Sequence, residues 1–470
     1  RYTYDFAGRE TRDAYYSAET IRWATVNSYE GDRVKVTPAA GGTPSTTVSD
    51  IRGRTTQLIE HLGTTTAAPG VTTSYTYDTA GNLATMTDGK GNRWSYTYDL
   101  AGNRLAASDP DKGVTTSTYN AANQLTSTTD ARGVTLKYFY DNLGRLIRTT
   151  KADGTTALVS TTYDTVKKGL VSATTRNLGS GTVTSRIDAY DGAGRPTSAT
   201  TVVPAITGLI GTQLAGNYTT TTTYNADGSV KTQTLPAAGG LPTETLTVGY
   251  TPAGLVKTLT GTLGTTTATY VQDTFYLQWG TVSGLLLGTH SGKAIQTTYN
   301  RDPYTQRPVA TNLYRQVAPG VTDERAEISY DPAGNIVQVK ATEGSGQVDN
   351  QCFSYDFQRQ LTEAWTPNSA TCDVASRSQG SLSGPSPYWT SWATGTTGKT
   401  TSRTDRTPTT SSTTTYTYPT DGSSAVRPHF ITGMTTSGST PGSGSYAADC
   451  CGEHDVSAGS GGCAADFGVG

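Results

Sequence analysis

Alternating aromatic and polar residues recur along the chain and predict short β-strands. Tyr75-Thr76-Tyr77 and Tyr96-Thr97-Tyr98 are two such segments. Because successive side chains of a strand point to opposite faces, this alternation places the tyrosines on one face of a sheet and the threonines on the other. We find no long segment with helical periodicity and capping residues. The pattern therefore predicts an all-β protein.

The predicted strands recur with a fixed period. Tyr77, Tyr98, Tyr119 and Tyr140 follow one another at intervals of 21 residues, and each opens a short unit of the form Tyr-(Asp/Asn)-x-x-(Gly/Asn). Looser copies begin at Tyr4, Tyr29, Tyr190, Tyr224, Tyr250, Tyr330 and Tyr355. A fixed period is the signature of a repeat array, which grows without splitting into separate cores. The length of 470 residues therefore does not imply several domains.

The unit that begins at each tyrosine has the chemistry of a tight turn. A type I turn favours Asp or Asn at its first position and Gly at its fourth, and Asp78 and Gly81 have this spacing. We expect positive φ at the Gly position, as in a turn closed by a bulge. Asn123 stands there in one copy and tolerates this conformation, whereas Arg359 in another copy predicts a distorted turn. The residues predicted to form the repeat turns are Tyr77, Asp78, Gly81, Tyr98, Asp99, Gly102, Tyr140, Asp141, Gly144, Tyr190, Asp191, Gly194, Tyr330, Asp331 and Gly334.

A second turn of the same chemistry lies between successive tyrosine units. It is seen at Asp88-Gly89-Lys90-Gly91 and at Asp130-Ala131-Arg132-Gly133. Each repeat therefore supplies two strands and two turns, which is a β-hairpin. We expect equivalent tyrosines of neighbouring repeats to stack across strands, at ~0.2–1 kcal/mol per pair. A single hairpin buries little, so its neighbours in the array supply the core.

Composition agrees with this architecture and excludes two classes of partner. The chain has 53 Gly and 28 Tyr but only 7 Phe, which suits many turns and half-buried strands. Charged residues make up 16% and the net charge is −2, so the basic footprint of a protein that binds nucleic acid or an anionic membrane surface is missing. No apolar run approaches the ~20 residues of a membrane-spanning helix.

The repeat resembles the YD repeat of the Rhs, teneurin and Tc-toxin families. The matching signature is Tyr-Asp-x-x-Gly-(Asn/Arg)-x-Leu, complete at residues 98–105 and one position shorter at 77–83 and 140–146. The resemblance covers roughly residues 1–435. It implies a long β-sheet that spirals into a hollow shell, in a secreted or cell-surface protein, most often bacterial. In that family the shell commonly encloses a C-terminal toxin or effector domain, which would be the partner of this segment.

Within the array we predict four regions. Residues 1–195 are regular repeats, 196–345 are degenerate repeats, 346–435 are terminal repeats with an irregular Cys- and Trp-containing loop, and 436–470 form a low-complexity tail without fixed structure. Because the sequence opens inside a repeat, we expect a fragment. Its array of about 14 units would form a sheet roughly 130 Å wide, or one turn of a shell about 40 Å across. Such a turn would not enclose a folded cargo unaided.

The sequence predicts no catalytic, cofactor or metal site. The self-cleavage segment Asp-Pro-x-Gly-Leu of the Rhs core is not matched, since Asp331-Pro332-Ala333-Gly334 is followed by Asn335. The spacing of Cys450, Cys451, His454 and Cys463 is unconvincing for zinc. Cys352 and Cys372 are expected to form a disulfide if the protein is exported, the alternative being two unpaired thiols.

Two further functions stay open. An extracellular adhesion module would bind cell-surface carbohydrate by stacking sugar rings on aromatic side chains, for which Trp365, Trp389 and Trp392 are the candidates, because they lie outside the tyrosine register. A hydrolase on an all-β fold is the other, for example on a propeller, whose blades of ~40–45 residues are twice the repeat period.

Overall fold

The computed structural model describes residues 1–17, 19–205, 214–288, 293–316, 322–375, 377–439, 441–448 and 454–455. Its main element is a single 35-stranded sheet, in which each strand pairs antiparallel with the next one along the chain. This is the all-β hairpin array that the sequence predicts.

The strands of the first half are short and joined mostly by tight turns. They are β1 (Tyr2–Tyr4), β2 (Glu10–Ser17), β3 (Thr20–Glu30), β4 (Arg33–Thr37), β5 (Ser45–Ser49), β6 (Thr55–His61), β7 (Gly70–Tyr77), β8 (Leu83–Thr87), β9 (Arg93–Tyr98), β10 (Arg104–Asp109), β11 (Gly113–Tyr119), β12 (Leu125–Thr129), β13 (Thr135–Tyr140), β14 (Leu146–Thr150), β15 (Ala157–Tyr163), β16 (Val171–Asn177), β17 (Thr182–Tyr190) and β18 (Pro196–Val203).

The second half continues the same order. Its strands are β19 (Gly216–Tyr224), β20 (Val230–Leu235), β21 (Glu244–Tyr250), β22 (Val256–Leu263), β23 (Thr266–Tyr276), β24 (Val282–Leu287), β25 (Ile295–Arg301), β26 (Pro308–Arg315), β27 (Thr322–Tyr330), β28 (Ile336–Glu343), β29 (Val348–Tyr355), β30 (Leu361–Trp365), β31 (Trp389–Thr394), β32 (Thr400–Arg406), β33 (Ser411–Thr417), β34 (Gly433–Gly438) and β35 (Gly442–Ser445). A short 3-10 helix, η3 (Gln379–Ser381), lies between β30 and β31, and β36 (Ala447–Ala448) pairs with β37 (His454–Asp455).

The tight turns have the predicted geometry. Gly81, at the fourth turn position after Tyr77, has φ +96°, and its amide donates to the Asp78 carbonyl at 3.1 Å. The strand register shifts at Tyr77, as expected of a bulge beside the turn. The predicted distortion at Arg359 is wrong, because Arg359 adopts φ +62° and closes the same turn through its amide to the Asp356 carbonyl.

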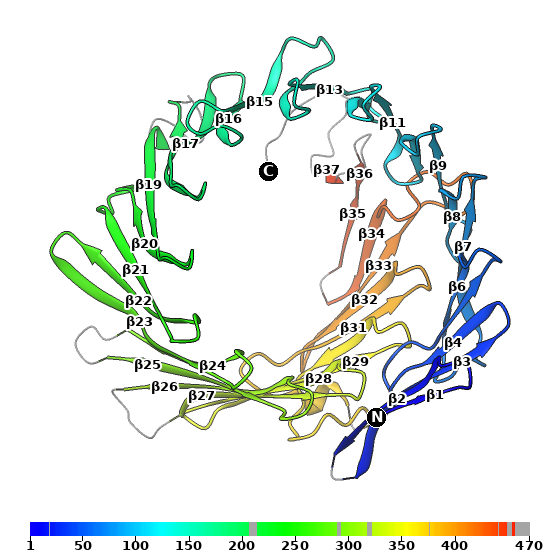
Figure 1. Cartoon of the computed structure of the whole chain (residues 1–470). Helices are drawn as coiled ribbons and strands as arrows, with labels where there is room; N and C mark the ends of the chain where they lie inside the picture. The colour runs from blue at the N-terminus through cyan, green and yellow to red at the C-terminus, as the bar shows by residue number, and fades with distance from the viewer. Residues whose placement is uncertain are drawn as a thin grey trace.

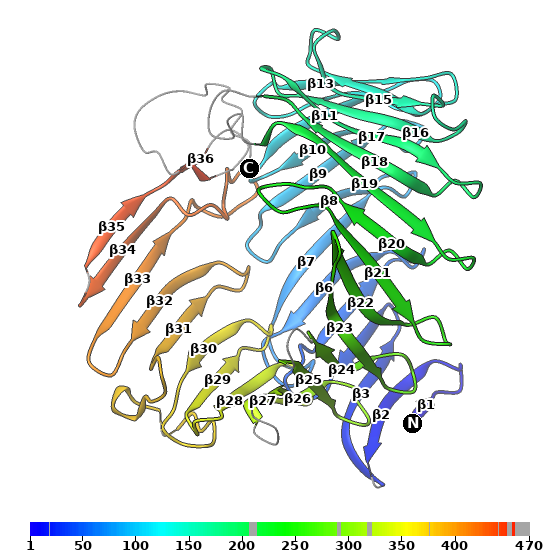
Figure 2. The ribbon, with the colours of Figure 1, turned by 90° about the vertical axis from the view of Figure 1, so that its left-hand side faces the viewer.

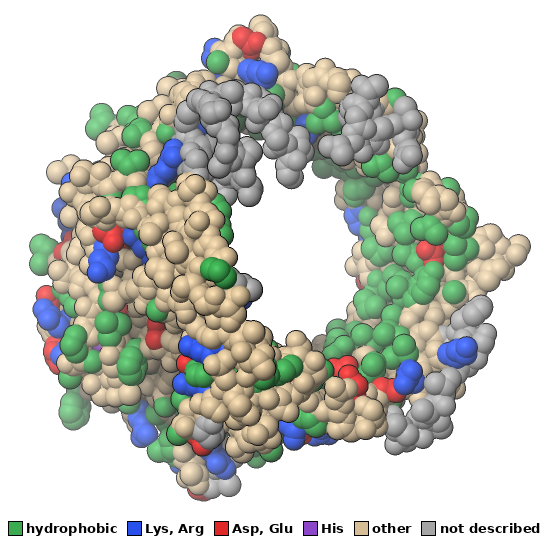
Figure 3. Space-filling view, turned by 180° about the vertical axis from the view of Figure 1, so that it is seen from behind, with side chains coloured by type: hydrophobic (Ala, Val, Ile, Leu, Met, Phe, Trp, Pro, Cys, Tyr) green, Lys and Arg blue, Asp and Glu red, His purple; other side chains and the backbone are tan. Residues whose placement is uncertain are grey.

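The sheet curls into a spiral around an open bore. Figure 1 shows the strands passing round a ring from β1 to about β27, with the last strands continuing past the start of the chain. Figure 2 shows that β30–β35 are displaced along the axis relative to β1–β9. In the space-filling view, hydrophobic side chains gather along one side of the bore, over β19–β24 (Figure 3). A single sheet wound in this way has no blades, so the propeller is the wrong architecture.

The regular array reaches further than the sequence predicts. β35 ends at Ser445, inside the region 436–470 that was expected to lack fixed structure, and β36 and β37 follow it. Cys450, Cys451 and Cys463 lie outside the described residues. Few of the described hydrophobic side chains are fully buried, as expected of a single-layer sheet. The buried cluster joins Cys352 and Trp365 of the sheet to Leu382 of the long connection between β30 and β31.

Candidate functional site

In the repeats where Asp follows the tyrosine, the Asp carboxylate holds the turn together. In the turn after β13, Asp141 Oδ1 accepts the amides of Leu143 and Arg145, both at 2.9 Å, and its Oδ2 accepts Arg145 Nε at 2.7 Å. Asp99 holds the amide and side chain of Asn103 in the same way. The Asn or Arg that follows the Gly of the signature therefore closes the turn, because its amide and its side chain both donate to the Asp four residues earlier. Asp191 and Asp331 bind the residues four positions further on in the same manner.

The tyrosines bind the backbone of the preceding strand. Tyr77 ends β7, and its hydroxyl donates to the carbonyl of Thr55, the first residue of β6, at 2.7 Å. Antiparallel pairing brings the end of one strand beside the start of its neighbour, so the same bond recurs along the array. The donors are Tyr29, Tyr77, Tyr119, Tyr140, Tyr163, Tyr190, Tyr224, Tyr250, Tyr276, Tyr330, Tyr355 and Tyr418.

Several tyrosine rings contact an arginine of the turn one repeat earlier. The guanidinium of Arg54 lies 4.5 Å from the ring centre of Tyr77, and that of Arg145 lies 4.2 Å from Tyr163. Over the described ranges, the ring pairs in contact are Tyr15–Trp23, Tyr15–Tyr304 and Trp94–His429, none of which joins two register tyrosines. In place of the predicted tyrosine stack, cation–π pairs of ~0.5–1 kcal/mol each are made by Tyr29, Tyr77, Tyr163, Tyr224 and Tyr330.

The turn carboxylates make the fold sensitive to acid. A hydrogen bond from the side chain of Thr156 lowers the pKa of Asp153 to about 2, and one from Arg145 lowers the pKa of Asp164 to about 2. Because these values lie below the ordinary 3.8, the carboxylates stabilise the fold above pH 4, and this contribution is lost as pH falls from about 4 to about 2.

We expect the urea midpoint of unfolding to be constant between pH 7 and 5 and to fall steeply between pH 4 and 2. The variant carrying Asp153→Asn and Asp164→Asn should lose part of that slope. A midpoint that does not change down to pH 2, or a slope equal in variant and wild type, would contradict the assignment. Urea titrations followed by circular dichroism provide the measurement.

Successive turns of the spiral touch along a seam that sequence reasoning did not find. At the first contact, Asn335 in the turn after β27 donates from Nδ2 to the carbonyl of Gly41 at 2.9 Å, across 294 residues. The amide of Ala333 donates to the carbonyl of Ala40 at 3.1 Å. The Oδ1 of Asn335 accepts Arg359 Nε at 2.8 Å, so this nearly buried amide is bonded at both ends. The β4–β5 loop and the β27–β28 turn, 23 strands apart, are thereby joined.

The second seam contact is centred on Asn92, which is completely buried. Its Nδ2 donates to Asp88 Oδ2 at 2.8 Å and to Asp421 Oδ1 at 2.9 Å, and its Oδ1 accepts the amide of Gly422 at 3.0 Å. Asp421 also pairs with Lys399. Although burial acts to raise the pKa of Asp421, the hydrogen bonds from Lys399 and Asn92 hold it below its ordinary value. The turn after β8 and the loop after β33 are thus fixed to each other.

A third contact lies next to the second and joins residues more than 300 positions apart. The amide of His429 donates to Asp111 Oδ1 at 3.0 Å, and His429 Nδ1 lies 2.8 Å from Asp111 Oδ2. The imidazole stacks on Trp94 with ring centres 6.0 Å apart, and the amide of Arg427 donates to the carbonyl of Pro110 at 2.7 Å. Together the three contacts join one coil of the spiral sheet to the next coil.

The cysteines and tryptophans singled out from the sequence lie in β29, β30, β31 and the connection between β30 and β31. Cys352 and Cys372 are joined as a disulfide with Cα atoms 5.5 Å apart. Trp365 is only 1% exposed, so its proposed role in sugar stacking is wrong. Trp389 is half-buried, with the guanidinium of Arg406 4.1 Å from its ring centre. Trp392 is also half-buried but lines an open cavity, so Trp392 is the residue for which sugar stacking is proposed.

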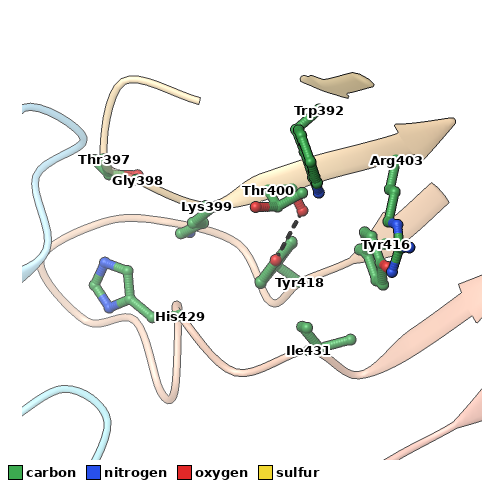
Figure 4. Close-up of a pocket in the computed structure, with 10 residues that line it drawn as sticks. All are labelled: Trp392, Thr397, Gly398, Lys399, Thr400, Arg403, Tyr416, Tyr418, His429 and Ile431. Carbon is green, nitrogen blue, oxygen red and sulfur yellow. Dashed lines mark hydrogen bonds between the residues drawn. The ribbon is translucent and has the colours of Figure 1, made fainter. Parts of the chain in front are cut away.

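Two open cavities border the seam. The first, of about 510 Å³, is lined by Trp392, Arg403, Tyr416 and Tyr418 of the last repeats and by His429 of the seam. Figure 4 shows these side chains around the cavity, with the hydroxyl of Tyr418 donating to the carbonyl of Thr400. The second, of about 530 Å³, lies between the β2–β3 hairpin and residues 302–332.

Neither cavity has the composition of a metal centre. No group of three or more His, Cys, Asp or Glu side chains suited to a metal ion occurs within the described ranges. In the same part of the chain, no helix is long and apolar enough to cross a membrane. The hydrogen bonds, ion pairs and ring contacts of the repeat turns and of the seam hold the curled sheet together.

Comparison with known proteins agrees with this geometry. Residues 44–183 match the teneurin YD-shell family. No curated protein sequence matches the chain. The crystal structure of TcdB2-TccC3 is similar, with a TM-score of 0.72 and 17% identity over 96% of this chain and 26% of that one. The Tc holotoxin pore of Photorhabdus luminescens gives 0.67 and 19% identity, over 96% of this chain and 22% of that one. The complex TcdB2-TccC3-Cdc42 gives 0.67 and 18%, over 95% and 22%.

At these identities the solved structures establish the fold. The present chain spans about a quarter of the length of each. The sequence-based assignment to YD repeats and to a spiralling shell-like sheet is confirmed.

Proposed function

Because residues 44–183 match the teneurin YD-shell family and the whole chain has the shell fold of TcdB2-TccC3, we propose that this protein is the wall of a secreted shell that encloses or presents an effector domain. The support for a structural role lies in the fold and the family match. The enclosed effector, the secretion and the bacterial toxin context are the parts that we propose.

The observation that carries the proposal is the seam. A curled sheet alone leaves a gap between its turns, whereas Asn335, Asn92 and His429 fix each turn to the next by direct bonds. These contacts join points about 24 strands apart, which at ~4.8 Å per strand gives a circumference of roughly 115 Å and a diameter of roughly 37 Å. Subtracting ~10 Å for side chains leaves a bore of roughly 27 Å.

The size of the bore restricts the cargo. A folded domain of 100 residues has a radius of gyration of ~13 Å and hence a diameter of roughly 34 Å. A wall of this curvature therefore accepts a smaller domain or a chain that is not fully folded. In this role no side chain acts chemically, and the turn aspartates are already occupied by their own turns.

Protease protection of the cargo in the full-length protein tests the proposal. We expect the effector segment to resist proteinase K in the wild type and to be degraded at least tenfold faster in Asn92→Ala, which opens the seam. Asn82→Ala is the matched control, because Asn82 holds the same turn position but, among the described residues, its side chain bonds only to Asp78. An effector cut in the wild type as fast as the isolated domain would contradict enclosure.

A second candidate function, carbohydrate binding, is favoured by the cavity that Trp392 lines together with Tyr416 and Tyr418. Flat aromatic faces beside polar side chains suit a sugar ring. We expect Trp392→Ala to remove any binding seen on a glycan array, and Trp279→Ala, at an exposed residue far from this cavity in the fold, to leave it unchanged. An array without a single binding glycan, or equal binding by the wild type and Trp392→Ala, would exclude this function for the cavity.

A further inference from the structure

The connection between β30 and β31 is unlike the tight turns of the array. It runs from residue 366 to 388, and we call its described parts, 366–375 and 377–388, the cap. The cap lies across the strands that precede it, since Gln338 Nε2 of β28 donates to the Ala370 carbonyl and Asn350 Nδ2 of β29 donates to the Ser369 carbonyl, both at 2.9 Å. It covers the face of β29 that carries Cys352, which is opposite to the face of Tyr355.

The cap covers buried side chains of the wall, and an arginine of the cap packs directly against them. Cys352 is 0% and Trp365 is 1% exposed. The guanidinium of Arg377, which belongs to the cap, lies 5.1 Å from the ring of Trp365 and 5.0 Å from the ring of Trp389. The same guanidinium pairs with Glu363 of β30. Arg377 is thus withdrawn from solvent, although it lies in an irregular segment.

The disulfide links the cap covalently to the wall beneath it. Cys352 lies in β29 and Cys372 in the cap, 20 residues further on. The pairing of β29 with β30, and of β30 with β31, uses backbone bonds to which the cap does not contribute. The disulfide thus adds a covalent cross-link to the hydrogen bonds and the ion pair that hold the cap, and the pairing of the wall strands does not depend on it.

We propose that the Cys352–Cys372 disulfide is a reducible latch that keeps the cap closed in an oxidising compartment. A dithiol reductant supplies two electrons and two protons, the S–S bond breaks to give two thiols, and the dithiol becomes a cyclic disulfide. The cap then separates from the wall. The ring faces of Trp365 and Trp389 and the peptide bond after Arg377 become accessible, so the latch also controls a cleavage site for proteases specific for basic residues.

The sequence provides a direct readout of this opening. Arg377 is the only Lys or Arg between residues 366 and 388, so trypsin cuts the cap at one position. The triple variant Cys450→Ser, Cys451→Ser and Cys463→Ser serves as the background, so that only the latch responds to reductant. Oxidised and dithiothreitol-treated protein are digested with trypsin at pH 7.5, and the new N-terminus at Ser378 is quantified by mass spectrometry.

We expect reduction to speed cleavage after Arg377 more than tenfold while cleavage after Arg54 and Arg145, in the repeat turns, stays slow. Adding Cys352→Ser and Cys372→Ser should give the fast cleavage without reductant. Equal cleavage after Arg377 with and without reductant would overturn the latch. So would a parallel increase at Arg54 and Arg145, because the disulfide would then hold the whole fold. Either failure leaves the shell proposal untouched, since the latch does not depend on a cargo.

Discussion

Asn92→Ala should lower the free energy of unfolding by about 3 kcal/mol, since it removes three hydrogen bonds from a buried position. The truncation leaves the amide of Gly422 without its acceptor and takes one donor each from the carboxylates of Asp88 and Asp421, of which Asp421 keeps Lys399. An unpaired buried polar group costs ~1–3 kcal/mol. Urea unfolding of the purified chain, followed by circular dichroism, gives the value.

Asn82→Ala separates the contribution of the seam from that of the turn. Asn82 closes its turn on Asp78 with the same two bonds, but within the described part of the chain it has no bond to the neighbouring coil of the spiral. We expect a loss of about 1 kcal/mol, the worth of an ordinary hydrogen bond. Equal losses for Asn82→Ala and Asn92→Ala would mean that the inter-turn bonds contribute nothing.

Gly41→Ala should destabilise the protein by about 4 kcal/mol. A Cβ at this position would lie 2.0 Å from Asp331 Oδ2, the carboxylate that holds the turn after β27, and Gly41 has φ +91°, which side-chain-bearing residues rarely adopt. The variant must therefore accept backbone strain and also push the two turns of the spiral apart. Thermal and urea unfolding measure the sum.

Gly53→Ala isolates the strain. Gly53 has φ +77°, and a methyl group added there would meet nothing within 4 Å, so only the conformational cost of about 1–2 kcal/mol applies. The difference between the two variants reports the clash at the seam. A Gly41→Ala loss no larger than that of Gly53→Ala would show that the turns are not in contact there.

Local chemistry determines the repeat, and for that reason the sequence predicts it well. Asp78 and Gly81 are three residues apart, and the turn they form depends on bonds within five residues. The same reasoning is wrong for Arg359, because it considers the strain of positive φ at one residue without the hydrogen bonds that hold the rest of the turn. In the structure the Asp356 carboxylate accepts the amides of Gln358 and Gln360, and Arg359 Nε binds Asn335, so the turn is held in spite of its arginine.

The seam depends on residues about 300 positions apart, and periodicity carries no information at that distance. Asn82 and Asn92 follow identical turn rules, yet only Asn92 meets the loop after β33. Curvature, accumulated over some 24 strands, decides which turn meets which. The connections 38–44 and 418–432, which carry seam contacts, are both longer than the five-residue repeat turns, and a break of this kind in a regular array marks a segment with another partner. Trp365 was misjudged for a related reason, because the cap that buries it has no repeat pattern.

The coupling between Asp111 and His429 tests the spiral most directly. These residues are 318 positions apart and meet only if one turn of the wall lies on the next. In a double-mutant cycle with Asp111→Ala and His429→Ala, we expect a coupling free energy of about 1–2 kcal/mol in urea unfolding. Coupling within about 0.3 kcal/mol of zero would mean that the two turns do not touch, and the wall described here would not exist.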